Sequence, residues 1–411
     1  MDIYQCIIPL HYASKIWGLT PFELIRQGNR DNEIKRLRNS VTGIFYSIFM
    51  CILITSNVLF VLISNFSHYL QTGYTANAAT LVILYFSFSS SALCAVIGCV
   101  INRERLLILL EAIFEFETRF YGSNSKIISF NRFLKFEIFF TYITIILISI
   151  YDIWLWGIYY NVELSFFPYI LILFIMATLT IQYTNIIYLS YDKFKLINLA
   201  LVKYISKMYE VQSDGNKNNN MFTLPTSYNI NNNNNNNNYY YQELRKKNFI
   251  SKLRDIRRKH YALHNISDEV NKVFGFQILF FMLSFFISIT NNIYYSLYFM
   301  LNESSEVRGS LLVTVEQLFW IMVMAVELIA ITVVCHMTSG EAMRTGIVLR
   351  NVLLYEPLNT MLSTEIQVFL EQIQNRPLRY SACGLFNIDL TLLSSFIGAV
   401  ATYVIVLIQM H

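Results

Sequence analysis

Seven long stretches of mainly apolar residues alternate with more polar segments along the chain. A helix needs about 20 mainly apolar residues to cross the hydrocarbon core of a bilayer. The stretches that meet this length are Val41–Ser64, Ala76–Ile101, Phe136–Tyr159, Phe167–Ser190, Phe274–Phe299, Leu311–His336 and Phe386–Gln409. The pattern therefore predicts an all-α integral membrane protein with seven transmembrane helices.

The polar segments predict how the rest of the chain is organised. Residues 216–238 end in eight consecutive asparagines, a composition with too little apolar surface to offset the entropy cost of ordering. The expected parts are a cytosolic N-terminal segment (1–40), transmembrane helices 1–4 (41–190), a cytosolic loop (191–272) with the disordered Asn-rich insert (216–238), transmembrane helices 5 and 6 (273–336), cytosolic anchor helices (337–384) and the last transmembrane helix (385–411).

The basic residues indicate the direction in which the helices cross. Cytosolic loops of membrane proteins are enriched in Lys and Arg. If the N-terminus is cytosolic, all of the 31 Lys and Arg residues except Arg308 lie in cytosolic segments. Because the number of crossings is odd, the C-terminus is then extracellular. The glycosylation sequons that begin at Asn65 and Asn302 fall in outer loops under this orientation.

Composition supports a membrane protein and narrows its chemistry. The chain is 55% hydrophobic and 14% charged, whereas about a quarter of the residues of a soluble domain are charged. The six cysteines fall in predicted spans or cytosolic segments, which disfavours a disulfide framework. The histidines are scattered, and the sequence contains no phosphate loop, zinc-ligand spacing or nucleophile elbow. We therefore expect neither an enzyme nor a cofactor, metal or nucleic-acid partner.

Acidic residues inside the apolar stretches point to a functional site. Asp152 lies in the third stretch, and Glu316 and Glu327 lie in the sixth. A charged group within a bilayer costs about 3 kcal/mol on insertion scales and marks a functional site by default. In the predicted orientation, Asp152 and Glu316 are in the outer halves of their helices and Glu327 is near the middle of the membrane.

Tryptophan and amide side chains accompany two of these acids. Trp156 follows Asp152 by one helical turn, and Gln317 and Trp320 lie within one turn of Glu316. Carboxylates and amides hydrogen-bond to hydroxyl groups, and the apolar face of a sugar ring stacks on indole. These five residues therefore predict a sugar-binding site. The alternative is that the acids lie at the membrane interface or bond to neighbouring helices.

The last apolar stretch carries the most specific motif. It reads Thr402-Tyr403, five apolar residues, and then Gln409. This stretch resembles the C-terminal signature of insect gustatory receptors, in which an aromatic residue usually follows the glutamine. Met410 takes that place here. The sequence Tyr380–Phe386 and the spacing from Gln317 to His336 resemble the fructose-sensing branch of that family.

The resemblance implies a ligand-gated, non-selective cation channel in the plasma membrane of sensory neurons. Each subunit of a homotetramer, or of a heteromer with related receptors, would contribute its last helix to a central pore that conducts Na, K and Ca ions. The implied ligand is a sugar, with fructose favoured, and the implied pore and gate residues are Thr402, Tyr403, Val406, Gln409 and Met410. Thr402, Val406 and Gln409 also share one helix face by spacing.

Other functions fit parts of the pattern. A gustatory or odorant-type subunit for a bitter ligand or carbon dioxide, which requires a partner, would share the motif. A secondary transporter would use the buried acids for ion coupling, but such proteins usually show internal repeats and Gly- or Pro-broken helices. A G-protein-coupled receptor requires the opposite orientation, which the distribution of basic residues disfavours.

Overall fold

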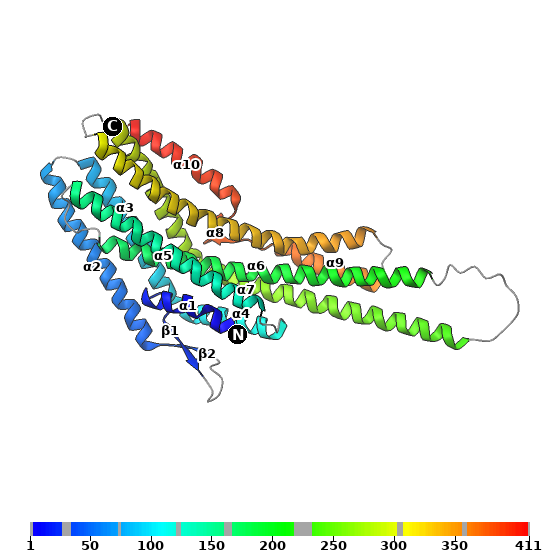
Figure 1. Ribbon diagram of the computed structural model, residues 1–411. Helices are drawn as coiled ribbons and strands as arrows, with labels where there is room; N and C mark the ends of the chain where they lie inside the picture. The colour runs from blue at the N-terminus through cyan, green and yellow to red at the C-terminus, as the bar shows by residue number, and fades with distance from the viewer. Residues whose placement is uncertain are drawn as a thin grey trace. The chain divides into compact units, whose positions relative to one another are not determined.

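Figure 1 shows the computed structural model, which describes residues 3–26, 34–72, 75–120, 125–159, 167–217, 232–301, 307–355 and 360–409. The chain divides into two compact units, which are described separately. Unit 1 consists of Met1–Ile187, Asp268–His336 and Tyr380–His411, and unit 2 consists of Tyr188–Ser267 and Met337–Arg379.

The described residues are almost entirely helical, with two short hairpins. In chain order the elements are α1 (Ile3–Ile16), β1 (Phe22–Arg26), β2 (Ile34–Asn39), α2 (Val41–Thr72), α3 (Thr75–Ile101), α4 (Arg103–Phe120), α5 (Ser125–Tyr159), α6 (Phe167–Lys217), α7 (Asn232–Leu301), α8 (Val307–Tyr355), α9 (Thr360–Asn375), β3 (Ser381–Ala382), β4 (Phe386–Asn387) and α10 (Leu390–Gln409). Both hairpins are antiparallel.

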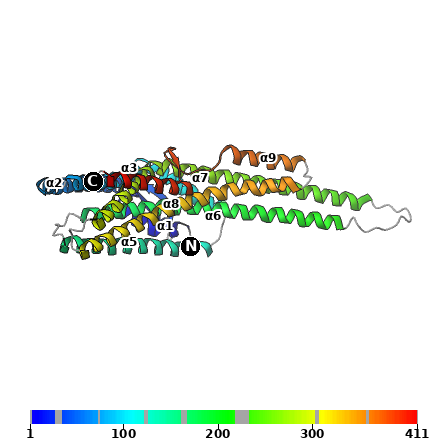
Figure 2. The same ribbon diagram turned by 90° about the horizontal axis from the view of Figure 1, so that it is seen from above.

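The seven predicted membrane helices are confirmed by length and composition among the described residues. The spans are Val41–Phe60, Val82–Ile101, Arg132–Leu155, Tyr169–Lys207, Lys247–Leu297, Leu311–Leu354 and Leu390–Gln409. Helices α6, α7 and α8 have 51, 70 and 49 residues, more than one crossing requires, and each contributes residues to both units (Figures 1 and 2).

The margins of two predicted segments differ from the structure. Helix α6 continues to Lys217 and α7 begins at Asn232, so helix covers both ends of the predicted insert, while 218–231 lie outside the described residues. Once a helix is nucleated, adding a residue costs little, so it extends into a polar flank. The last span begins at Leu390 rather than Phe386, because residues 381–387 form the β3–β4 hairpin.

The β3–β4 hairpin turns through two residues that have a left-handed backbone conformation. Cys383 has φ of 52° and Gly384 has φ of 75°. The hairpin backbone lies close to Gly275 of α7, where a Cβ atom would stand 3.2 Å from the Cys383 nitrogen. Asp389 then starts α10 by accepting a hydrogen bond from the Thr391 amide at 2.9 Å. The Thr391 hydroxyl and this amide hold the pKa of Asp389 below its usual value.

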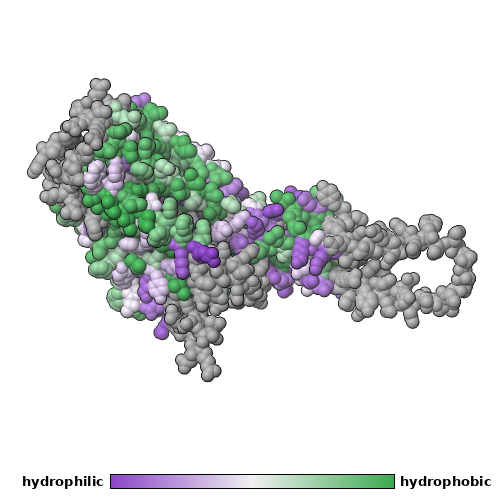
Figure 3. Space-filling model, in the orientation of Figure 1, coloured by the Kyte–Doolittle hydropathy of each residue, from purple (hydrophilic) through white to green (hydrophobic). Residues whose placement is uncertain are grey.

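The surface of unit 1 is apolar where its helices face outward, and Figure 3 shows hydrophobic side chains covering much of the visible face of the helical bundle. The aromatic residues Phe45, Phe136 and Phe140 are all exposed. Exposed phenylalanines at this density would be costly in water. They are what a lipid-facing surface requires.

Helices α3 and α7 form a close seam inside unit 1. Gln277 of α7 is fully buried against Gly98, and its amide Nε2 donates to the Ala95 carbonyl at 3.4 Å. Two helical turns further along α7, the Ser284 hydroxyl donates to the Ser87 carbonyl at 2.7 Å. Small residues on α3 allow this approach, as is common between membrane helices.

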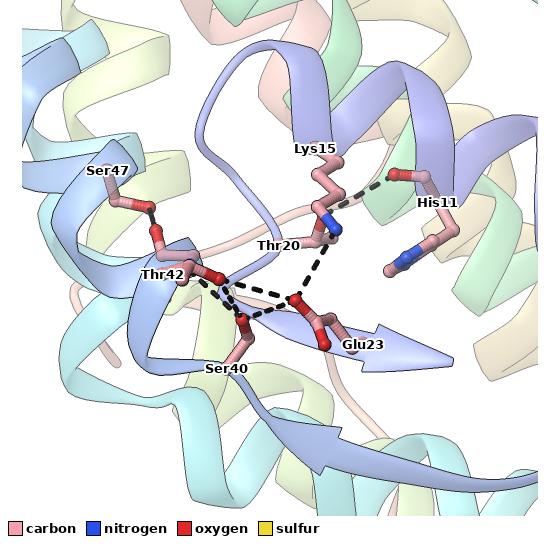
Figure 4. A network of polar contacts seen from close by, with 8 residues as sticks. His11, Lys15, Thr20, Glu23, Ser40, Thr42 and Ser47 are labelled. Atoms are coloured by element: carbon pink, nitrogen blue, oxygen red, sulfur yellow. Dashed lines mark hydrogen bonds and ion pairs between the residues drawn. The ribbon is translucent and has the colours of Figure 1, made fainter. Parts of the chain in front are cut away.

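A polar network joins the N-terminal elements to the first span (Figure 4). The Glu23 carboxylate of β1 accepts a hydrogen bond from Ser40 at 2.7 Å and pairs with Lys15 at 3.8 Å. Ser40 also caps α2, since its hydroxyl accepts the Gly43 amide at 3.2 Å. The hydrogen bond from Ser40, and then the Lys15 ammonium, hold the pKa of Glu23 below its usual value.

Aromatic side chains fix the N-terminal segment to the bundle and hold α1 against β1. The Trp17 indole donates to the Tyr142 hydroxyl at 2.8 Å and stacks on Phe174 with 4.9 Å between ring centroids. His11 lies against Phe22 with 5.3 Å between centroids. Burial, and then the nearby Lys15 ammonium, lower the pKa of His11 to about 4. The sequence did not predict this docking, because it depends on contacts between distant residues.

Unit 2 is held by polar contacts between its helices. The Glu365 carboxylate of α9 receives Arg254 and Arg257 of α7, each through Nε at 3.1 Å. Asn198 of α6 donates to the Glu341 carbonyl of α8 at 2.8 Å and accepts the Thr345 hydroxyl at 2.6 Å. Buried pairs with several hydrogen bonds fix the register of packed helices.

Candidate functional site

Four of the five predicted ligand-binding side chains are brought together in unit 1. Asp152 comes from α5, and Glu316, Gln317 and Trp320 come from α8. All four are buried, with between 4% and 8% of their surface exposed. We call them the acidic cluster. The fifth residue, Trp156, is on the same helix as Asp152, but its side chain lies outside the described part of the structure.

Hydrogen bonds connect the members of the acidic cluster across two helices. The Trp320 indole Nε1 donates to Asp152 Oδ2 at 3.0 Å. The Gln317 amide Nε2 donates to Glu316 Oε2 at 3.1 Å. The carboxyl groups of Asp152 and Glu316 are themselves hydrogen-bonded. The cluster is therefore one connected unit, in which every member has a partner.

Aromatic rings from two further helices lie beside the cluster. Tyr169 at the start of α6 meets Trp320 edge-to-face, with 6.2 Å between centroids. The same ring meets Tyr85 of α3 at 5.6 Å and Phe88 at 5.5 Å. Sequence reasoning missed Tyr169 and Tyr85. The available signal was that α6 begins where α5 ends, so its first residues must lie near Asp152.

Helix α7 carries further polar residues close together in its sequence. Thr290, Asn291, Asn292 and Tyr294 are buried, and Tyr295 is half-buried. The Thr290 hydroxyl donates to the Phe286 carbonyl at 2.7 Å, so this hydroxyl is hydrogen-bonded within its own helix. The Tyr151 hydroxyl of α5 donates to the Leu312 carbonyl of α8 at 3.2 Å, which ties together the two helices that carry the cluster.

Glu327 does not belong to this cluster. It is two turns beyond Trp320 on α8, and its Oε2 accepts a hydrogen bond from Thr180 of α6 at 3.3 Å. A second half-buried acid, Glu137 of α5, accepts the Asn185 amide at 2.8 Å. Both acids have polar partners on α6, as expected for ionisable groups that face a bundle interior. These contacts fit a structural role.

Helix α10 is the least enclosed of the seven spans. Only 11% of its apolar membrane-spanning stretch is buried within the chain, compared with 83% of the corresponding stretch of α6. Thr402, Val406 and Gln409 are all exposed, and the Thr402 hydroxyl donates only to the Gly398 carbonyl of its own helix, at 2.9 Å. Met410, the remaining predicted gate residue, lies outside the described residues.

Aromatic contacts connect α10 to α7. Phe286 meets Phe396 edge-to-face with 5.6 Å between centroids, and it meets Tyr403 in the same way at 5.4 Å. Tyr403 is otherwise 56% exposed. Among the described residues, nothing covers the face with Thr402, Val406 and Gln409, while Tyr403, at the neighbouring edge of α10, packs on α7.

The structure describes only one of the two predicted glycosylation positions, and only its backbone. Asn65 lies in α2, beyond the end of the span Val41–Phe60, and its side chain is outside the described part of the structure. Asn302 lies outside the described residues. Among the described residues, no group of three or more His, Cys, Asp or Glu side chains could hold a metal ion.

The fold and the cluster define a multi-pass, seven-helix membrane protein with a buried polar centre. The chain belongs to the 7tm chemosensory receptor family, whose sequence model matches residues 7–411. A curated relative is the gustatory receptor for sugar taste 43a of Drosophila melanogaster, which is 23% identical over 255 residues. The match covers 59% of this chain and 58% of the relative, so it spans somewhat over half the relative's length.

Solved structures show the same fold over the whole chain. The insect olfactory receptor OR5 from Machilis hrabei matches with a TM-score of 0.64 at 14% identity, covering 99% of this chain and 98% of the receptor. The same receptor in complex with eugenol matches with a TM-score of 0.63, covering 100% of this chain and 99% of the receptor. The predicted membership of the insect receptor family is confirmed.

Proposed function

We propose that this chain is a sugar-gated, non-selective cation channel of the plasma membrane of sensory neurons, and that fructose is its ligand. The observation that carries the proposal is the acidic cluster, in which the Trp320 indole is hydrogen-bonded to Asp152, in a chain similar to a sugar taste receptor. Its family consists of chemosensory receptors, and the structurally similar olfactory receptor binds the small molecule eugenol.

The chemistry of the acidic cluster suits a polyhydroxylated ring. Carboxyl and amide oxygens of Asp152, Glu316 and Gln317 accept hydrogen bonds from hydroxyl groups. Trp320 and Tyr169 offer aromatic faces to the C–H surface of a sugar, and Trp156 is proposed to add a third. A ligand that enters here must exchange some of the internal hydrogen bonds for its own. The site therefore favours ligands with several hydroxyl groups over purely apolar ones.

The orientation we propose places the N-terminus in the cytosol and the acidic cluster in the extracellular half of the membrane. The distribution of basic residues supports it, because Arg308 alone falls on the outer side. An extracellular sugar then reaches the cluster without crossing the membrane. Epitope tags on the two termini, stained in unpermeabilised cells, test this direction, since only the C-terminal tag should be accessible.

The pore is proposed to form from α10 in a homotetramer. The exposed stripe of Thr402, Val406 and Gln409 would face the shared axis, with Met410 beside Gln409. A ring of amide side chains suits partly hydrated Na, K and Ca ions, and an apolar ring can close a pore by dewetting. The low burial of α10 within one chain supports this role, because such a helix needs partners.

Sugar binding would open the pore by favouring the state that binds it better. Helix α7 is proposed to connect the two sites. Its buried polar residues Asn291 and Asn292 lie toward the end that follows Phe286, and Phe286 contacts Tyr403 of α10. A small movement of α7 would change this aromatic contact directly.

Currents from cells that express this chain alone, recorded across a panel of sugars, test the proposal. We expect fructose to evoke a current, and Trp320→Ala to raise the half-maximal concentration or abolish the response. Trp154→Ala is the matched control, because Trp154 is on α5 near Asp152 but is 43% exposed. Silence to every sugar with confirmed surface expression would refute a self-sufficient sugar receptor.

A further inference from the structure

The acidic cluster contains a feature that sugar binding alone does not require, namely two carboxyl groups in contact. Asp152 and Glu316 are 8% and 4% exposed and are hydrogen-bonded to each other. Each also accepts one N–H: Asp152 from the Trp320 indole and Glu316 from the Gln317 amide. The remaining Asp152 oxygen, Oδ1, is buried and receives no amide, hydroxyl or indole hydrogen among the described residues.

An ionised carboxylate only accepts hydrogen bonds, so two carboxyl groups can bond to each other only through a proton on one of them. Two carboxylates in contact within an enclosed site also repel strongly if both are ionised. We propose that Asp152 and Glu316 share one proton, and that this proton lets the pair present both a donor and acceptors to the hydroxyl groups of a polyol. The second half of this statement rests on the proposed function.

The shared proton determines what the cluster offers to a ligand. With one proton, the pair carries a single negative charge and presents both a donor and acceptors, which matches a hydroxyl group. Without the proton, two adjacent negative charges face the rings of Tyr169 and Trp320. Acids beside aromatic faces form a site for an ammonium group. With a second proton, the pair is neutral and its strongest acceptor is lost.

The titratable groups around the pair include two tyrosines. Tyr169 of α6 interacts electrostatically with Asp152, Glu316 and Tyr85 of α3. These phenols ionise far above the pH at which a receptor works. Arg308, which lies two turns before Glu316 on α8, is the basic residue of that helix nearest to it in sequence. An ion pair between Glu316 and Arg308 is the competing explanation for a pH-dependent response, and the experiment must distinguish it from a shared proton.

The first measurement is the half-maximal fructose concentration as a function of external pH. We expect a minimum at intermediate pH, with a rise of up to about tenfold per pH unit on either side once the pair loses or gains a proton. Glu316→Gln replaces the shared proton with a permanent amide donor and should flatten this dependence. Glu327→Gln, which changes a half-buried acid outside the pair, should leave this dependence as in the wild type.

An additional variant separates the shared proton from an ion pair. Arg308→Gln should keep the wild-type pH dependence if Asp152 and Glu316 share a proton. The proposal is overturned if Arg308→Gln flattens the response as Glu316→Gln does, or if the wild type shows no pH dependence. A shift of the pH minimum in Glu327→Gln would equally contradict it.

Infrared difference spectra of the purified protein test the proton without any sugar. We expect the wild type to show a carbonyl band of a protonated carboxylic acid that both Asp152→Asn and Glu316→Gln remove and Glu327→Gln retains. If this band behaves as expected but no sugar opens the channel, the proposed function fails and the shared proton stands. If neither Asp152→Asn nor Glu316→Gln alters the band, the shared proton is refuted.

Discussion

Replacing Gly98 with alanine tests the α3–α7 seam on which the bundle depends. A Cβ atom at Gly98 would stand 2.4 Å from Gln277 Nε2, 2.9 Å from its Cγ and 3.0 Å from its Cδ. Carbon and nitrogen atoms do not approach this closely, so the Gln277 side chain or the helices must move. Gln277 is fully buried and is held by Ala95 and Cys99.

The cost follows from these contacts. Overpacking a closely packed core costs about 1–3 kcal/mol, and loss of the Gln277 hydrogen bonds adds about 1 kcal/mol. Alanine regains about 0.5–1 kcal/mol over glycine within a helix. The expected net destabilisation by Gly98→Ala is therefore about 1–3.5 kcal/mol.

Thermal unfolding of the detergent-purified protein, followed by size-exclusion fluorescence, measures this loss. Gly340→Ala in α8 is the control, because no atom lies within 4 Å of the added carbon. Truncation of the neighbour should relieve the clash, so Gly98→Ala should cost much less in a Gln277→Ala background. The reasoning is refuted if Gly98→Ala is as stable as Gly340→Ala, or if the two seam substitutions destabilise additively.

Three further predictions address other parts of the chain. Burial and the Lys15 ammonium lower the pKa of His11 to about 4. The free energy of unfolding should therefore be highest above pH ~6.5 and should fall by up to about 3 kcal/mol as the pH drops toward 4. Melting curves of His11→Gln should lack this loss. Glu365→Ala should destabilise unit 2 by about 1–3 kcal/mol, because Arg254 and Arg257 lose their shared partner; an unchanged rate of proteolysis would contradict this. Tyr403→Ala should change the half-maximal sugar concentration about 2- to 10-fold by removing an aromatic pair, whereas Tyr403→Phe should not.

Much of the fold was predictable because a bilayer sets the length of each span. Seven apolar stretches and their order could be derived from the sequence, since about 20 apolar residues suffice for each. The end points were less predictable, because helices such as α7 extend far beyond the membrane and the hairpin before α10 depends on Cys383 and Gly384. The N-terminal hairpin was missed because its contacts, such as Ser40 with Glu23, are not periodic.

The residues of the candidate site were also only partly predictable from the sequence. Asp152, Glu316, Gln317 and Trp320 could be predicted because polar side chains are conspicuous within apolar helices. Tyr169 and Tyr85 could not, because tyrosines are common in this chain and only the packing of the helices brings Tyr169 to Trp320 and Tyr85 to Tyr169. The bond between Asp152 and Glu316 joins residues of two helices, α5 and α8, and required the structure.

The central claim is that a sugar binds at the acidic cluster and thereby opens the pore. The most direct measurement is the position of the bound ligand in an experimental structure of the purified chain with saturating fructose. We predict density for the sugar between α5 and α8, in contact with Trp320 and Gln317, together with a wider separation of α10 helices around the axis. Sugar density elsewhere, or none at the acidic cluster in a preparation that fructose opens, would contradict the account.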